Sequence, residues 1–447
     1  MKKKHISLLF LFAALLSLPA CNDFLDIQPI GKVMPQTATE YRALLTEAYS
    51  TVPADRGMST FRSDELTMEG EQNATNLDSY LDVWRWNDVS PDETTLSFNW
   101  RTYYYVNYIA NSVIENKDGI TEASAAERDQ LVGEAYMLRA YMHFLLVNLY
   151  AEPYTHCDPA TTKGIPLKLN SDVREVLSRN TVAEVYASVL ADIDEAEKLL
   201  NIEAWPEGET YRFNTISVNA LRARVYLYMG QWKQAYDYAT DIVSRHGQLE
   251  DLTVTSSTLP NHYQSVEAIL SMERIFTSSS LGAGFVNPSV LSYYKTGDMR
   301  RSKFYRQLSA SATEVVKAGT NEYRCTFRSA EFYLTAAEAA VELDDMENAR
   351  HYLTELMKKR YAAAVYPDRE AEVMDMTRDE LRQEIRDERF RELAFEGHRW
   401  FDLRRTTLPE LVKTYQGETY VLEQGDERYT LRIPPEAIEA NPGLEEE

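Results

Sequence analysis

The chain has 447 residues, 44% of them hydrophobic, and a formal net charge of −23. A protein this acidic repels the phosphate backbone, which excludes nucleic acid as a partner. The length is ample for a large core in one or two domains. Only Cys157 and Cys325 follow the N-terminal segment, so the chain is no disulfide scaffold. We expect both thiols to stay buried and unpaired, with a bond between them as the alternative.

The first twenty residues have the pattern of a signal peptide. Lysines at positions 2–4 precede an apolar stretch from Ile6 to Leu18, which is too short to cross a bilayer as a helix. The sequence Leu18-Pro19-Ala20-Cys21 then resembles a bacterial lipobox. It predicts lipidation of Cys21 and durable anchoring, since two or more acyl chains hold a protein on its membrane. The alternative is an ordinary secretory signal followed by a chance cysteine.

Helical periodicity dominates the rest of the chain. Thr181 and Glu184 predict a capping box, and apolar residues then recur at steps of three and four up to residue 200. The same pattern covers residues 131–150, 215–229, 232–245, 329–343 and 346–360. Gly230 separates one pair of these segments, and small residues at fixed offsets are typical of tetratricopeptide hairpins. The predicted fold class is mainly α, a frame of tetratricopeptide-like helical hairpins with long irregular insertions.

Four insertions in this frame are too long to be simple connections. They are rich in Pro, Gly, Ser, Asn and aromatic residues, and they cover residues 53–98, 151–178, 201–214 and 247–325. Long loops on a rigid helical frame are usually functional. We therefore expect the binding site among them.

The segment from residue 377 to residue 405 is the strongest candidate for catalysis. Thr377 and Glu380 predict a capped helix, whose buried face is defined by Leu381, Ile385 and Phe395. Three carboxylates, followed by a histidine, fall on that face, and such a cluster suggests acid–base chemistry. These residues are Glu388, Glu392, Glu396 and His398.

The stronger interpretation of the same cluster is structural. A buried carboxylate must be paired, and arginines are close by in the sequence. The expected partners are Arg389, Arg399, Arg404 and Arg405. The single histidine has no second ligand at metal-binding spacing, and no nucleotide-binding or hydrolase motif is present. We therefore expect no metal, no cofactor and no enzymatic activity.

Six segments carry a resemblance to one known family. The start of the mature chain, Cys21 to Pro29, is similar to C-x-D-F-L-D-x-x-P, and Ile385 to Arg405 is similar to E-R-x-x-E-L-x-x-E-G-x-R-W-x-D-L-R-R nearly residue for residue. The other segments are Trp100 to Asn116, Glu134 to Leu149, Arg328 to Glu338 and Ile433 to Leu444. Together they resemble the SusD/RagB family of outer-membrane lipoproteins over almost the whole chain.

The resemblance implies a surface-exposed lipoprotein of the bacterial outer membrane that binds glycans. It implies about four tetratricopeptide-like units, with loops on one face forming the ligand site and another face packing on a SusC-like TonB-dependent transporter. The expected division is a signal peptide over 1–20, a tether over 21–40, and two family regions over 41–250 and 251–447. Two alternatives stay open, a RagB-like component for peptide uptake and a scaffold that binds only protein partners.

The resemblance also indicates how ligand is held, by an arc of aromatic rings with a few amide or guanidinium groups. A sugar presents C–H bonds on its face and hydroxyls at its rim, which suits stacking and hydrogen bonds. Two aromatic loop clusters fit this chemistry, and they supply the predicted ligand-binding residues. These are Trp84, Trp86, Asn87, Tyr293 and Tyr294. The alternative is that the two tryptophans anchor their loop to the core.

Overall fold

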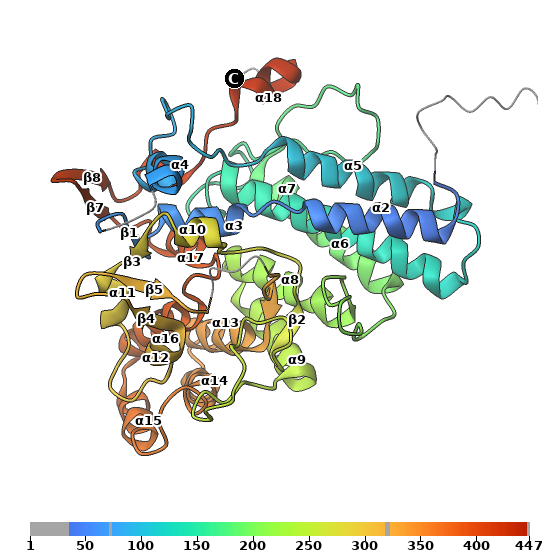
Figure 1. Cartoon of the computed structure of the whole chain (residues 1–447). Helices are drawn as coiled ribbons and strands as arrows, with labels where there is room; N and C mark the ends of the chain where they lie inside the picture. The colour runs from blue at the N-terminus through green and yellow to red at the C-terminus, as the bar shows by residue number, and fades with distance from the viewer. Residues whose placement is uncertain (1–34, 71–73, 318–321, 445–447) are drawn as a thin grey trace, which may run out of the picture.

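Antiparallel helices packed in succession form the frame of the protein (Figure 1). The structure, a computed structural model, describes residues 35–70, 74–317 and 322–444. The predicted signal peptide and the lipidation site Cys21 lie outside this part. Within it, no helix combines the length and apolar character needed to cross a membrane.

The frame runs through both predicted family regions. Its helices are α2 (Ala38–Thr51), α5 (Arg101–Glu115), α6 (Ala125–Tyr150), α7 (Val182–Leu199), α8 (Thr215–Tyr228), α9 (Trp232–His246), α13 (Ser329–Glu342), α14 (Met346–Met357) and α16 (Arg378–Leu393). Neighbours pack in the order α2 on α5, α5 on α6, α6 on α7, α8 on α9 and α13 on α14. Helix α13 also packs on α8 and α9, so helix contacts cross the expected boundary at residue 250. The boundary itself stays a prediction.

Local sequence signals account for most of these helices. Capping boxes begin α7 at Thr181 and α16 at Thr377, as predicted. Gly230 turns the chain between α8 and α9 with φ of 67°, a conformation that glycine adopts without strain. The predicted fold class is confirmed. Helix α6 starts earlier than expected, because a capping box at Ser124 was not recognised, and α14 ends three residues early at Met357.

In the described residues, four two-stranded antiparallel sheets lie in or next to the insertions and in the C-terminal segment. They pair β1 (Leu66–Thr67) with β3 (Phe285–Val286), β2 (Ala268–Leu270) with β6 (Phe327–Arg328), β4 (Tyr305–Gln307) with β5 (Thr313–Val315) and β7 (Leu411–Tyr415) with β8 (Glu418–Leu422). The first pair sets Leu66 opposite Val286 and so ties the insertion at 53–98 to the one at 247–325. The insertions are therefore part of the folded body.

Short helices complete the loop-rich side and the C-terminal segment. They are α3 (Asp55–Met58), α4 (Ala74–Trp84), α10 (Ser278–Leu281), α11 (Pro288–Ser292), α12 (Arg300–Phe304), α15 (Tyr366–Asp375), α17 (Arg399–Thr406) and α18 (Pro435–Ala440), with 3₁₀ turns η2 (Ser59–Arg62), η3 (Lys117–Gly119), η4 (Glu427–Tyr429) and η5 (Pro442–Leu444). One core fills the helices from α2 to α9, a second lies under the insertions, and a third joins α13, α14 and α16.

The two cysteines of the described part are free thiols, as predicted. Cys325 is buried and Cys157 is half-buried. The alternative of a disulfide between them is excluded in this structure.

Candidate functional site

The carboxylates of α16 belong to a buried network of ion pairs. Glu388 accepts from Arg300 at 2.8 Å and from Arg391 at 2.7 Å. Glu392 accepts four hydrogen bonds of 2.7–2.9 Å from three arginines. Across the described residues the network joins six cations to six carboxylates, namely Arg300, Lys317, Arg328, Arg360, Arg369, Arg391, Glu267, Asp298, Glu384, Glu388, Glu392 and Glu396.

The pairing fixes the charge state of these groups. Burial by itself raises the pKa of Glu392, yet the guanidinium groups of Arg360 and Arg328 bring the pKa well below its usual value. Glu392 is therefore an ionised carboxylate whose lone pairs are already occupied. Because it is fully buried, it has no access to a substrate. The structural interpretation of the cluster is confirmed.

The partners of these carboxylates differ from the predicted ones. Arg389 and Arg405 both pair with Asp402, and Arg399 pairs with Asp64 at 2.7 Å. Apart from Arg391 of α16 itself, the cations that neutralise these carboxylates come from other segments up to 92 residues away in sequence, such as Arg300 of α12 and Arg328 of β6. Closeness in the sequence did not identify most of the paired cations, because these long-range contacts form only when the chain is folded.

Helix α16 does not reach Phe395, although the sequence predicted that residue on its buried face. The helix ends at Leu393, and Phe395 and Gly397 adopt left-handed φ values of 60° and 69°. A side chain at position 397 would come within 2.7 Å of the Arg56 carbonyl oxygen, so only glycine fits there. This turn, rather than a continuing helix, brings Glu396 onto Arg328 and Lys317.

His398 is buried just after this turn. Its Nε2 lies 3.0 Å from a guanidinium nitrogen of Arg56. Burial and that cation lower the pKa of His398 well below its usual value, so the ring is neutral. In the part of the chain that the structure describes, no cluster of three or more His, Cys, Asp or Glu side chains is arranged for a metal ion.

The predicted tryptophans are anchored in the fold. The indole N–H of Trp84 donates to the Leu66 carbonyl at 3.0 Å, and that of Trp86 donates to the Arg62 carbonyl at 2.8 Å. Each side chain is only 1% exposed. The Lys413 ammonium lies 5.1 Å and 4.1 Å from the two ring centroids. Trp84 has no free face for stacking, whereas Trp86 reaches the edge of a large cleft.

The other predicted residues lie in three different settings. Asn87 donates to Asp82 at 2.9 Å and so holds its own loop. Tyr294 is 5% exposed and its hydroxyl contacts Tyr305 at 2.8 Å, which places it in the core. Tyr293 is half-buried and lines a separate cavity of about 200 Å³ beside α16. Trp84 and Tyr294 belong to one buried core beneath the insertions rather than to a shared binding surface, and neither belongs to the site proposed below.

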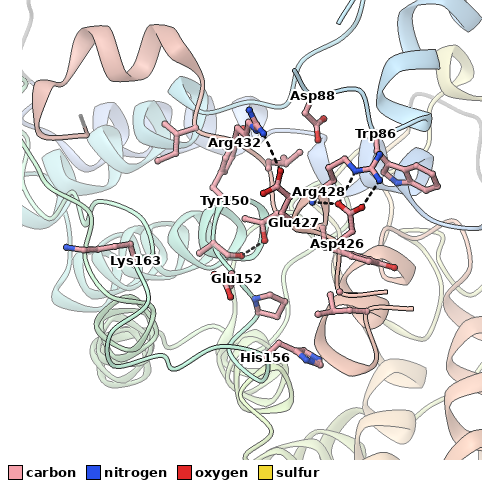
Figure 2. Close-up of a pocket in the computed structure, with 18 of the residues that line it drawn as sticks. Trp86, Asp88, Tyr150, Glu152, His156, Lys163, Asp426, Glu427, Arg428 and Arg432 are labelled. Carbon is pink, nitrogen blue, oxygen red and sulfur yellow. Dashed lines mark hydrogen bonds and ion pairs between the residues drawn. The ribbon is translucent and has the colours of Figure 1, made fainter. Parts of the chain in front are cut away.

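A cleft of about 1120 Å³ lies between the end of α6 and the C-terminal segment (Figure 2). One wall is the loop after α6, and the other is the segment from residue 425 to residue 433. Trp86, Asp88 and Val89 from the loop after α4 close one end, and Ile438 of α18 contributes from the C-terminal tail. We call this space the cleft.

Arg404 of α17 fixes the distance between the two walls. Its guanidinium donates to the Ala151 carbonyl at 2.6 Å on one wall and to the Tyr429 carbonyl at 2.6 Å on the other. A third bond goes to the Asn148 carbonyl. Burial lowers the pKa of Arg404 to about 10, so the group stays charged near neutral pH. The walls also bond directly, from the Leu431 N–H to the Leu149 carbonyl at 2.9 Å.

The accessible lining of the cleft is mixed polar and apolar, and its polar groups carry both signs of charge. In Figure 2, Glu152 and Glu427 lie between Lys163 on one side and Arg428 on the other. Arg428 pairs with Asp426 at 2.6 Å, while Glu427 is exposed. The Trp and Tyr rings that line the cleft are the buried side chains of Trp86, Tyr150 and Tyr429, which are 1–3% exposed, whereas His156 is exposed. The cleft therefore offers hydrogen bonds and small apolar contacts rather than a stacking platform.

The residues of the cleft were missed by reasoning from aromatic content. Glu152 and Arg432 are 280 positions apart in the sequence, and neither lies in a predicted aromatic cluster. A signal was nevertheless present, because each wall adjoins a segment of the family resemblance. One wall follows the segment from Glu134 to Leu149, and the other ends where the tail segment begins, at Ile433.

Taken together, the helical-repeat frame and its loop-walled cleft define a binding protein built on tetratricopeptide-like units. Two family profiles match the chain, one described as starch-binding associating with outer membrane over residues 23–227 and the SusD family over residues 283–446. The chain belongs to the SusD/RagB family.

Individual relatives agree with this assignment. A SusD-like protein of Formosa agariphila is 22% identical over 95% of both chains. A SusD superfamily protein from Bacteroides fragilis has the same fold, with a TM-score of 0.78, 20% identity and coverage of 93% of this chain and 100% of the other. The surface glycan-binding protein A from Bacteroides uniformis matches with a TM-score of 0.71, 15% identity and coverage of 91% and 99%.

Proposed function

We propose that this protein captures glycans at the cell surface and passes them to a SusC-like TonB-dependent transporter without modifying them. The observation that carries the proposal is a preformed cleft of about 1120 Å³ in a chain of the SusD/RagB family. That volume is at the upper end of ordinary ligand pockets, which range from about 300 to 1,000 Å³, and suits an oligomer better than one sugar.

The cleft would hold a glycan mainly through its hydroxyl groups. Carboxylates and guanidinium groups, such as those of Glu152 and Arg432, make charge-assisted hydrogen bonds that are stronger than neutral ones. Val89 and Ile433 offer apolar contacts to the C–H faces of the sugar rings. Because Arg404 sets the wall spacing by contacts to backbone carbonyls, the cleft is formed before ligand arrives, which reduces the entropic cost of binding.

Membrane attachment is a second part of the proposal. The lipobox-like sequence that ends at Cys21 supports a lipid anchor, and one matching profile describes proteins that associate with the outer membrane. The tether of residues 21–40 would then connect the lipid to the folded body. The pairing of Glu388, Glu392 and Glu396 with buried cations supports a role in capture rather than hydrolysis.

Peptide uptake is the second candidate function. The observation that favours it is the accessible charge of both signs along the cleft, with no exposed Trp or Tyr side chain among the described residues that line it. An extended peptide, with its charged side chains and backbone amides, would satisfy such a lining. Glycan binding remains the first proposal because a relative of the same fold is named for it.

Titration calorimetry with neutral glycans, acidic glycans and mixed peptides tests the proposal. We expect saturable glycan binding without product formation. The double variant Glu152→Ala/Arg432→Ala should weaken binding at least tenfold, about 1.4 kcal/mol, because it removes two charged contacts. The matched control is Lys198→Ala, an exposed residue of α7 outside the cleft. Binding of peptides alone would favour the second candidate, and unaltered glycan affinity in the double variant would place the site elsewhere.

A further inference from the structure

A second pocket, of about 370 Å³, lies between the insertion at 201–214 and the start of the insertion at 247–325. It shares no lining residue with the cleft. Two hydrogen bonds join the two insertions at this pocket: the Ser271 backbone N–H donates to the Thr210 carbonyl at 3.0 Å, and the Asn214 side-chain amide donates to the Ile269 carbonyl at 2.9 Å. The pocket is therefore as rigidly held as the frame beneath it.

Two aromatic side chains stand in this pocket in different ways. The Trp205 indole donates to the Phe213 carbonyl at 3.0 Å, and guanidinium groups of Arg212 and Arg42 lie 4.9 Å and 5.6 Å from its centroid. Trp205 is thus a fixed wall. Tyr263 is half-buried, and its ring packs at 4.5 Å against only one neighbouring ring, the imidazole of His262. Tyr263 is the side chain placed to stack on a ligand.

Polar groups of the right kind surround these rings. Gln264 donates to Glu207 across the mouth of the pocket, and Glu203 lies on the same rim. His246 lines the pocket, and its buried Nε2 has no hydrogen-bond partner among residues 35–70, 74–317 and 322–444. A buried polar atom normally has a partner, so a ligand hydroxyl or a water would complete this one.

We propose that this pocket is a second saccharide site, which binds a neutral sugar unit stacked on Tyr263 and hydrogen-bonded by Gln264, Glu207 and His246. The choice of a saccharide rests on the proposed function, whereas the site itself rests on the pocket. The rim carboxylates of Glu203 and Glu207 repel uronic or sulfated sugars, which leaves neutral glycans as the ligand class. Two sites on one protein raise the avidity for a polymer whose repeats reach both.

Fluorine NMR of the chain labelled with 5-fluorotryptophan tests both sites in one sample. The sequence has six tryptophans, and Trp205 lines the second pocket while Trp86 lines the cleft. Each of the two signals is assigned by its loss from the spectrum of Trp205→Phe or Trp86→Phe. The probes are malto-oligosaccharides and laminari-oligosaccharides at millimolar concentration, with oligogalacturonates as the anionic comparison.

We expect a neutral oligosaccharide to shift the Trp205 signal, and an oligogalacturonate to leave it unchanged. Tyr263→Ala should weaken that response at least tenfold, whereas Tyr263→Phe, which keeps the stacking face, should retain it. An unaltered signal from the buried Trp400 shows that the variants are folded.

A Trp205 signal that no neutral probe moves, or that moves equally in Tyr263→Ala, overturns the second site. If Trp86 alone responds, the second site is refuted and the proposed function stands. If Trp205 alone responds, the second site is supported and the main site must be sought outside the cleft. Silence from both signals refutes both.

Discussion

Neutralising Glu392 should destabilise the fold far more than neutralising a surface carboxylate. The side chain is fully buried and accepts four hydrogen bonds from Arg300, Arg328 and Arg360. Glu392→Gln keeps the shape but removes the charge, and it turns an amide NH₂ toward guanidinium donors. Breaking a buried ion pair in this way costs about 3–5 kcal/mol, a large part of the 5–15 kcal/mol that is typical of folded proteins.

Urea unfolding followed by circular dichroism measures this loss. With a slope of about 3 kcal/mol per molar urea, the midpoint should fall by about 1 M or more. The control is Glu195→Gln, which removes a carboxylate from the exposed pair with Lys198, whose side chains are 49% and 63% exposed. Such surface pairs contribute about 0–1 kcal/mol, so the control midpoint should hardly move.

The pH dependence provides a second check on the same variant. The native pKa of Glu392 is well below its ordinary value of 4.5, so the stability it provides is present above that value and is lost as the pH falls through the native pKa. The gap between wild type and Glu392→Gln should therefore narrow on acidification. Equal midpoints for Glu392→Gln and Glu195→Gln at neutral pH would refute the view that the network supports the frame.

Three further predictions concern other parts of the fold. Arg404→Met leaves buried carbonyl groups of both cleft walls unpaired, which costs about 1–3 kcal/mol for each group. The variant should therefore lower both the urea midpoint and the glycan affinity. An unaltered affinity would show that the spacing of the walls does not govern binding. Gly397→Ala should greatly reduce the soluble yield and melting temperature, because the new methyl would meet the Arg56 carbonyl at 2.7 Å with φ of 69°; normal melting would contradict this. Burial raises the pKa of Asp55 and of Glu65 to about 7. As the pH rises from about 4 to 7, each buried carboxyl group therefore lowers the free energy of unfolding by up to about 1.4 kcal/mol per pH unit. The melting temperature of the wild type should fall over that range, and that of Asp55→Asn should fall less. The same pH dependence in both proteins would contradict the raised pKa of Asp55.

The frame could be predicted from the sequence because its signals are local. The capping boxes at Thr181 and Thr377 each use residues three positions apart, and the turn at Gly230 depends on one residue. For the network around Glu392, the sequence predicted that cations pair with the carboxylates but not which cations do so. Burial required a cation, but Arg300 and Arg360 come from distant segments that meet only in the folded chain.

The candidate site was much harder to predict than the frame. A tryptophan that stacks on a sugar and one that donates to a core carbonyl have the same sequence signature, and Trp84 is of the second kind. The cleft draws Glu152 and Arg432 from segments far apart in the sequence, and no periodicity relates them. Tyr263, which stands in the second pocket, lies in a loop where nothing in the sequence separates it from the other tyrosines.

The most direct test of the account is a crystal structure of the protein soaked with a glycan that calorimetry has shown to bind. We predict continuous saccharide density in the cleft, with hydroxyl groups in contact with Glu152 and Arg432 and the glycosidic bonds intact. Density at another surface with an empty cleft, or a cleaved glycan, would contradict the central claim.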